Sequence, residues 1–224
     1  MQTIYNDLTR PPQELVDGFR AVLKEYSPSC LVTDARKRVG AIGGLLPVVA
    51  SHKIAGPALT VNLSIDDLVD CMPVLARAKP GDVIVLAAHG CTRTAMWGGL
   101  MSTLSKQAGI AGGIVDGAIR DVDEIRDLDF PVWYRGTVPR PSPTAVHDRT
   151  EPVQVNVPVV INGEVVNPGD IVVADENGIA VVPPAIAEEV LAGTKMNIAK
   201  EKVIRDKISS GASVNELLAE FGHL

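Results

Sequence analysis

Apolar residues near the start of the chain recur at the spacing of an α-helix. After the proline pair at positions 11 and 12, one face of such a helix would carry four apolar side chains, those of Leu15, Phe19, Val22 and Leu23. Proline is favoured in the first turn of a helix, where its missing N–H has no partner to lose. The pattern therefore predicts an amphipathic N-terminal helix with a buried stripe, and a second short helix over residues 29–34.

From Ile54 onward the pattern changes to short apolar runs bounded by glycine and proline. Such runs predict β-strands, several of them buried on both faces. We expect strands over residues 57–63, 83–88, 110–115, 132–134, 157–161, 171–174 and 179–182. Segments with helical spacing lie between them, over residues 65–78, 100–108 and 122–128. This alternation predicts parallel strands joined by helices in the middle of the chain, followed by a more purely β second half.

The end of the chain returns to helical spacing. Residues 184–208 predict a long helix. Ser213 followed by Glu216 is the capping-box pattern of a helix start, and it precedes Leu217, Leu218 and Phe221. We expect this tail to be docked and not disordered.

A Lys/Asn-Pro-Gly-Asp sequence precedes an apolar strand twice, at residues 79–82 and at residues 167–170. Proline sets the first turn angle and glycine supplies the positive one. The two copies indicate a pseudo-repeated element of one sheet. We interpret both as structural turns without a catalytic role.

The composition of the chain is compatible with one hydrophobic core. Of its 224 residues 46% are hydrophobic and 21% charged, and the formal net charge is −6. The lysines and arginines are scattered and form no basic runs, which argues against nucleic acid as a partner. The cysteines at positions 30, 71 and 91 lack the spacing of zinc or disulfide sites. No apolar stretch has the length of a signal peptide or a membrane span, so we expect a cytoplasmic protein without membrane contact.

The segment 112–121 carries the most information about function. An apolar strand there ends in Asp-Gly, and Arg120 and Asp121 follow. Ligands of α/β sheets gather at the carboxyl ends of strands, where arginine can hold a carboxylate and aspartate can bind a magnesium or manganese ion. The alternative is structural: Asp121 would be a helix N-cap, Glu124 a capping acid, and Arg120 the partner of a neighbouring carboxylate.

A second candidate feature is the run Gly98, Gly99, Leu100 and Met101, where paired glycines precede a helical segment. Backbone N–H groups at a helix start can receive a carboxylate or a developing oxyanion. If the strands at 83–88 and 110–115 lie side by side, their carboxyl ends bring this run and Arg120 to one cleft. The alternative is an ordinary flexible helix entry.

Other candidates for chemistry are weaker. His89 follows a predicted strand and could be a base or a metal ligand, although a lone histidine is more often a structural residue. No nucleophile elbow, Walker loop or dinucleotide fingerprint is present, so covalent serine catalysis and nucleotide binding have no support.

Several motifs, taken together and in this order, resemble a known family: Lys79-Pro-Gly-Asp-Val-Ile-Val, the Trp-Gly-x-Leu segment at Trp97, Val115-Asp-Gly-Ala-Ile-Arg-Asp, Phe130-Pro-Val, Val157-Pro-Val and Pro168-Gly-Asp-Ile-Val-Val-Ala-Asp-Glu-Asn-Gly. This is the RraA-like family, which includes 4-hydroxy-4-methyl-2-oxoglutarate aldolases and the non-catalytic regulator of ribonuclease activity A. The resemblance runs from about Leu31 to Gly211. It implies an α/β fold, the swivelling β/β/α domain, spanning residues 1–224 with a core at about 31–183 and C-terminal helices at 184–224. It also implies a homotrimer or homohexamer with sites between subunits.

The resemblance further implies roles for individual residues. In aldolase members the arginine matching Arg120 binds the carboxylate of a 2-oxo acid, and the aspartate matching Asp121 binds Mg²⁺ or Mn²⁺, largely through waters. The segment matching Gly98 to Met101 contacts pyruvate, partly by backbone amides. Glu201 is matched to a glutamate that an adjacent subunit adds to the water shell. Aldolase members usually carry an acid where this chain has Gly99.

Together these features predict a lyase, a class II pyruvate aldolase or oxaloacetate decarboxylase that requires a divalent metal ion. It would cleave a C–C bond in small 2-oxo acids such as 4-hydroxy-4-methyl-2-oxoglutarate or oxaloacetate and release pyruvate. Two alternatives stay open. One is a non-catalytic regulator of ribonuclease activity that acts by protein contact, and the other is a lyase for a sugar-acid type of substrate.

Overall fold

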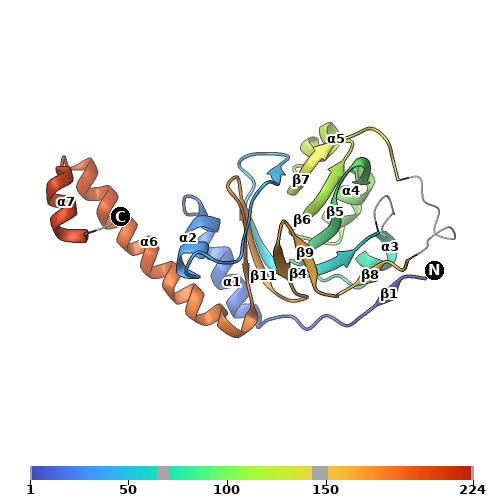
Figure 1. Ribbon diagram of the computed structural model, residues 1–224, viewed down its shortest axis with the longest axis horizontal. Coiled ribbons are helices and arrows are strands. Elements are labelled where there is room, and N and C mark those ends of the chain that lie inside the picture. Colours follow the sequence, from blue (N-terminus) through green and yellow to red (C-terminus); the bar gives the residue numbers. More distant parts are fainter. Residues whose placement is uncertain (1, 65–70, 143–150, 223–224) are drawn as a thin grey trace.

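The computed structural model describes residues 2–64, 71–142 and 151–222. In this part of the chain a ten-stranded mixed sheet is covered by helices, and one long helix leaves the body (Figure 1). The sheet has the order β2-β12-β11-β4-β5-β6-β7-β3, with β8 paired to β4 and β1 (Ile4–Tyr5) paired to β8. This mixed α/β architecture is the predicted fold class.

The middle of the sheet is parallel. It consists of β4 (Ile54–Asn62), β5 (Val83–Trp97), β6 (Gly112–Ile119) and β7 (Val132–Thr137). Its connections contain α3 (Cys71–Leu75), α4 (Gly99–Gln107) and α5 (Val122–Asp127). The predicted strand–helix alternation is confirmed, although residues 65–70 of the first predicted helix lie outside the described residues.

The remaining pairs of the large sheet are antiparallel, apart from β1 with β8. They involve β2 (Ala41–Ile42), β3 (Leu46–Pro47), β8 (Gln154–Val155), β11 (Ile171–Asp175) and β12 (Gly178–Val182). A separate hairpin joins β9 (Val159–Ile161) to β10 (Glu164–Val166). Among the described residues from β7 to β12 every regular element is a strand, so the more purely β region ahead of the C-terminal helices is confirmed.

The strand predicted over residues 83–88 is longer in the structure. Residues 89–96 continue β5 after an irregularity at His89 and Gly90, whose φ angles are 52° and 71°. Positive φ angles break the alternation of side chains, and pairing with β6 resumes at Cys91 opposite Gly117. The extension of β5 beyond residue 88 could not be predicted, because a bulge interrupts the period-two pattern from which strands are predicted.

Helices cover the sheet in two groups (Figure 1). The helices α3, α4 and α5 pack on the parallel strands through one hydrophobic cluster, which contains Trp97, Ile125 and Phe130. The helices α1 (Gln13–Val22) and α2 (Pro28–Ala35), with the start of α6, pack on β11 and β12 through another cluster. Phe19 is fully buried in that second cluster, so the predicted N-terminal stripe is confirmed.

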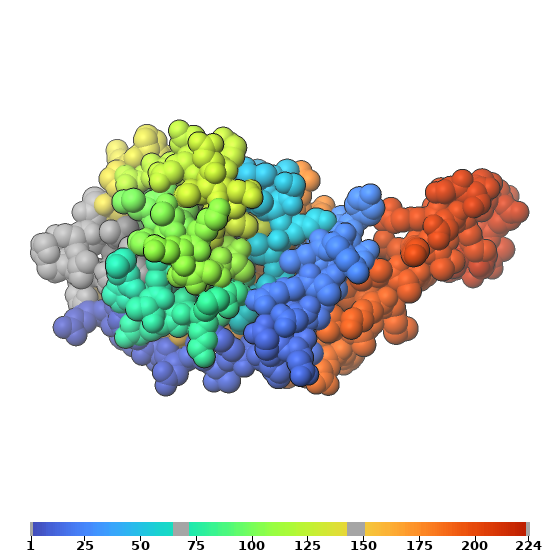
Figure 2. All heavy atoms as spheres, turned by 180° about the vertical axis from the view of Figure 1, so that it is seen from behind, coloured from blue at the N-terminus to red at the C-terminus, as the bar shows by residue number. Residues whose placement is uncertain are grey.

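The C-terminal helices form an arm that projects from the body (Figures 1 and 2). A short 3-10 turn η2 (Pro184–Ile186) leads into α6 (Ala187–Ser209), and α7 (Val214–Phe221) folds back beside the end of α6. The predicted capping box of Ser213 and Glu216 is present, and Lys207 of α6 pairs with Glu220 of α7 at 2.6 Å. The tail is docked as predicted, with α7 packed on α6. Among the described residues no helix is long and apolar enough to cross a membrane.

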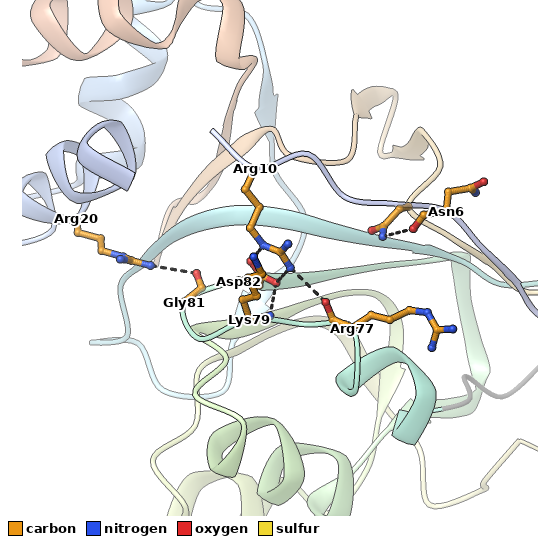
Figure 3. Close-up of polar contacts among 8 residues, drawn as sticks. Asn6, Arg10, Arg20, Arg77, Lys79, Gly81 and Asp82 are labelled. Carbon is orange, nitrogen blue, oxygen red and sulfur yellow. Dashed lines mark hydrogen bonds and ion pairs between the residues drawn. The ribbon is translucent and has the colours of Figure 1, made fainter. Parts of the chain in front are cut away.

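The two Pro-Gly-Asp turns have the same construction. The carboxylate of Asp82 accepts the N–H of Lys79 at 2.7 Å, and that of Asp170 accepts the N–H of Asn167 at 2.8 Å. Their other partners differ. The Asn167 side-chain amide donates to Asp170 at 3.2 Å, whereas Arg10 binds Asp82 through Nε at 2.8 Å and Nη2 at 2.6 Å (Figure 3). The first turn thereby ties the N-terminal segment to the start of β5.

Candidate active site

The site is built where β5 and β6 end side by side. Trp97 at the end of β5 lies opposite Ile119 at the end of β6, and the N–H of Arg120 donates to the Trp97 carbonyl at 2.9 Å. The strands are parallel, so both chain segments leave the sheet at the same edge. The predicted convergence of the glycine pair with Arg120 and Asp121 is confirmed as geometry.

Asp121 occupies the N-cap position of α5 but does not cap that helix with its side chain. Its φ angle is 55°, in the left-handed region that aspartate tolerates better than most residues. Its Oδ2 instead accepts the N–H of Gly99 at 3.1 Å and lies 3.4 Å from Nε of Arg120. The capping interpretation of this carboxylate is therefore wrong. The pairing of Arg120 with a neighbouring carboxylate is present, but loose.

The absence of a side chain at Gly98 permits this approach. A Cβ atom added there would lie 2.7 Å from Oδ2 of Asp121 and 3.2 Å from Cγ of Arg120. Any larger residue would push the arginine and the aspartate away from the start of α4. The backbone of Gly98 is extended, with φ at −157°, which any residue can adopt. Glycine is therefore required here for the close approach of Asp121 and Arg120 and not for its backbone conformation.

A pocket of about 200 Å³ opens in front of these residues. Its lining includes five of the predicted site residues, namely Gly98, Leu100, Met101, Arg120 and Asp121, together with Ala95, Met96, Trp97, Pro141 and Ser142. The side chains of Arg120 and Asp121 are 41% and 39% exposed, so both can meet a ligand from solvent. Gly99 takes part through its amide, which contacts Asp121.

Glu124 is a residue of this site whose role the sequence did not reveal. A Cβ atom added at Gly99 would overlap the Glu124 carboxylate, so the glutamate fills the space of a side chain at position 99. An acid is therefore present where Gly99 appeared to remove one, supplied from the first turn of α5. The available signal was its place three residues after Asp121, but that spacing equally fits a capping acid.

Two weaker candidates are not brought to the pocket within one chain. His89 lies exposed at the β5 irregularity and is not part of the pocket lining. Glu201 lies on α6, paired with Arg205 at 3.0 Å in a groove between α2 and α6. The prediction for Glu201 concerns a neighbouring subunit, so it stays a prediction.

The donors at the pocket suit a hard cation. Asp121 offers carboxylate oxygens to the pocket, and magnesium is commonly bound by one or two carboxylates while it keeps several waters. The described residues contain no cluster of three or more His, Cys, Asp or Glu side chains that could enclose a metal ion.

Known proteins place this architecture in a family. The family model described as Aldolase/RraA matches residues 29–181. The chain belongs to the RraA-like family. A relative from Halalkalibacterium halodurans, named "Putative 4-hydroxy-4-methyl-2-oxoglutarate aldolase", is 34% identical over 201 residues, which cover 87% of this chain and 90% of that protein.

Solved structures agree with the RraA-like assignment. RraAS2 of Streptomyces coelicolor, described as an unusual member of the RNase ES inhibitor RraA protein family, is 30% identical. It aligns with a TM-score of 0.74 over 88% of this chain and all of that one. An uncharacterised protein from Pseudomonas syringae aligns with a TM-score of 0.80 at 25% identity, over 99% of this chain and all of that one. Relatives of RraA-like type thus carry names of both an aldolase and a ribonuclease inhibitor, and the site must distinguish between them.

Proposed function

We propose that this RraA-like protein is a divalent-metal-dependent lyase that cleaves small 2-oxo acids to pyruvate. The observation that supports it is the convergence of one guanidinium, one amide and two carboxylates at the same strand ends. Arg120 and Asp121 line one pocket, the Gly99 amide contacts Asp121, and Glu124 fills the space beside Gly99.

Arg120 would bind the carboxylate of the 2-oxo acid. Its guanidinium is only loosely paired with Asp121, at 3.4 Å, and is 41% exposed, so its fork of donors is available. Arginine binds a carboxylate by two parallel hydrogen bonds, which fixes the plane of the substrate. A volume of about 200 Å³ suits a molecule of the size of pyruvate with a short extension.

Asp121 would hold the cation, Mg²⁺ or Mn²⁺. When bound, such an ion supplies positive charge to a developing enolate and lowers the pKa of its water ligands. The Gly99 amide restrains Asp121 Oδ2, so the carboxylate is oriented before any ligand arrives. Orientation of this kind reduces the reorganisation needed during the reaction.

Glu124 is the group proposed to move the proton. In the retro-aldol reaction its carboxylate would accept the proton of the C4 hydroxyl as the C3–C4 bond breaks and a carbonyl forms at C4. The electron pair of that bond passes to C3 as the pyruvate enolate, and a proton returned to C3 completes pyruvate. With oxaloacetate the same bond breaks with loss of carbon dioxide, so one site can serve both reactions.

The assembly and location of the protein are part of the same proposal. We infer a cytoplasmic homotrimer or homohexamer in which the projecting α6 arm of one subunit, with Glu201, approaches the pocket of another. Light scattering after size-exclusion chromatography tests this inference. A monomer at micromolar concentration would contradict it.

Pyruvate release tests the lyase proposal. Oxaloacetate and 4-hydroxy-4-methyl-2-oxoglutarate are supplied separately to protein stripped with EDTA and to protein reloaded with Mg²⁺ or Mn²⁺. We expect release only after reloading. Equal release with and without metal would overturn the metal requirement.

The second candidate function is binding to a ribonuclease, since RraAS2 is described as a member of an RNase ES inhibitor family. Inhibition of RNA cleavage that does not change on addition of EDTA, with no turnover of any 2-oxo acid tested, would favour this candidate over the lyase.

A further inference from the structure

A short chain of hydrogen bonds lies behind the glycine pair at the start of α4. The indole Nε1–H of Trp97 donates to Oγ of Ser102 at 2.8 Å, and the Ser102 hydroxyl donates to the carbonyl of Gly98 at 3.1 Å. The backbone N–H of Ser102 donates to the same carbonyl at 3.1 Å. The Gly98 carbonyl is therefore held by two donors of one residue.

This chain of hydrogen bonds is rigid at its Trp97 end. The Trp97 side chain is 2% exposed, and its ring stacks on Phe130 with centroids 6.4 Å apart and an angle of 7° between the planes. Gly113 lies against the ring, where an added Cβ atom would be 3.1 Å away. Ser102 itself is fully buried. The direction of the indole N–H is thus set by packing, and a buried indole N–H requires an acceptor.

Trp97 also anchors the other half of the site. Its carbonyl accepts the N–H of Arg120 at 2.9 Å, while its side chain reaches Gly98 through Ser102. The carbonyl of Gly98 and the N–H of Gly99 belong to one planar peptide unit and point in opposite directions. Fixing the carbonyl therefore aims the Gly99 N–H, which donates to Asp121 at 3.1 Å.

We infer that Ser102 is a positioning residue for the pocket, because its hydroxyl orients the Gly98–Gly99 peptide and so holds the carboxylate of Asp121. The inference rests on the proposed function, since it concerns the same site. Ser102 acts through Gly98 and Gly99 and does not itself line the pocket. If Ser102 has this role, the orientation of the Asp121 carboxylate depends on a buried hydroxyl behind the site. The affinity of the site for a cation then depends on the same hydroxyl.

The chain offers a matched control in Ser105. It lies on the same helix, is equally buried, and its hydroxyl has no hydrogen-bond partner within the described residues. Ser105→Ala removes the same atom from α4 as Ser102→Ala, but leaves the hydrogen bonds between Trp97 and Gly98 intact.

The experiment measures two properties of the wild type, Ser102→Ala and Ser105→Ala. One is the exchange rate of the Gly99 amide by NMR, and the other is the dissociation constant of Mn²⁺ by electron paramagnetic resonance. For Ser102→Ala we expect about three- to tenfold faster exchange, from the loss of one hydrogen bond. We expect about tenfold weaker Mn²⁺ binding, as for other residues that orient a ligand. Ser105→Ala should match the wild type.

Two further variants keep the test decisive. Ser102→Thr retains the hydroxyl and should restore both values, and Ser102→Cys, a weak donor of similar size, should give an intermediate result if Ser102→Ala does not fold. Wild-type exchange and affinity in Ser102→Ala, or equal losses in Ser105→Ala, would overturn the inference. Failure of the wild type to bind Mn²⁺ would contradict the proposed function instead, and amide exchange would still decide the role of Ser102.

Discussion

Two arginine–aspartate pairs lie at opposite ends of the parallel strands. At the start of β5, Arg10 binds Asp82 through two hydrogen bonds of 2.8 and 2.6 Å, and the aspartate side chain is 1% exposed. At the end of β6, Arg120 approaches Asp121 at 3.4 Å, and both side chains are about two-fifths exposed. The residue types are the same, but only in the first pair are the carboxylate oxygens fully occupied by hydrogen bonds within the protein.

This difference separates a structural pair from a site. The Asp82 carboxylate also accepts the N–H of Lys79, so its oxygens are committed to the fold. Asp121 is oriented by a single amide and faces a pocket. Unsaturated polar groups held in place at a surface are available to a ligand, whereas a buried pair is costly to break.

The largest effect is expected from Asp121→Ala. Loss of the proposed cation ligand should lower kcat/KM for oxaloacetate by about a thousandfold, at the upper end of the loss from removing one group that stabilises developing charge. The control is Asp127→Ala, an exposed acid of the same helix that is absent from both pockets lined by Arg120 and Asp121. Steady-state assays with saturating Mg²⁺ measure both. Equal activity in the two variants would remove Asp121 from the mechanism.

Arg10→Ala should act on stability instead. It leaves the buried Asp82 carboxylate without its cation, which costs about 3 kcal/mol of unfolding free energy. Urea denaturation measures the loss, and kcat/KM per folded molecule should stay at the wild-type value. Asp17→Ala, which breaks the exposed pair with Arg20, is the control and should cost less than about 0.5 kcal/mol. A large fall in kcat/KM for Arg10→Ala would contradict a purely structural role.

Glu124→Gln tests the acid that the sequence did not reveal. With 4-hydroxy-4-methyl-2-oxoglutarate as substrate, the amide keeps the shape of the side chain but cannot accept the proton of the C4 hydroxyl, so kcat should fall by about a hundredfold. The KM for the 2-oxo acid should change little, because Arg120 is intact. The double variant Gly99→Asp with Glu124→Ala, which moves the acid to position 99, should recover part of the lost activity. No change in kcat for Glu124→Gln would show that the proton comes from elsewhere.

The smallest effect concerns the second turn. Burial raises the pKa of Asp170 above its ordinary value of 3.8, and this effect exceeds the opposing effects of the Asn167 hydrogen bonds and the charge of Arg36. A raised carboxyl pKa means that the folded state favours the protonated form. Its stabilising contribution is full below pH 3.8 and is lost as pH rises through the folded pKa. Asp170→Asn should therefore flatten the pH dependence of urea stability in that window and change stability at pH 7 by less than about 1 kcal/mol. An unchanged pH profile would contradict this assignment.

Much of the fold could be predicted from hydrophobic spacing. The parallel middle, the more purely β region after it and the buried stripe with Phe19 all followed from periods of 2 and 3.6 residues. Strands of two residues, such as β2 and β3, could not be predicted because their partners define them. The contact between Arg10 and Asp82 joins residues 72 positions apart, and no local pattern reveals it.

The candidate site divides in the same way. The convergence of Arg120 and Asp121 with the glycine pair followed from a general rule about strand ends. The place of Glu124 did not, because an acid three residues after an N-cap fits two interpretations equally well. The structure distinguishes the two interpretations, because the Glu124 carboxylate occupies the space that a side chain at Gly99 would fill.

The most direct test of the central claim is a crystal of the protein grown with Mn²⁺ and pyruvate. An anomalous difference map would locate the ion. The account predicts a peak beside the Asp121 carboxylate and a pyruvate whose carboxylate contacts Arg120. A peak at another place, or pyruvate bound without contact to these two residues, would contradict it.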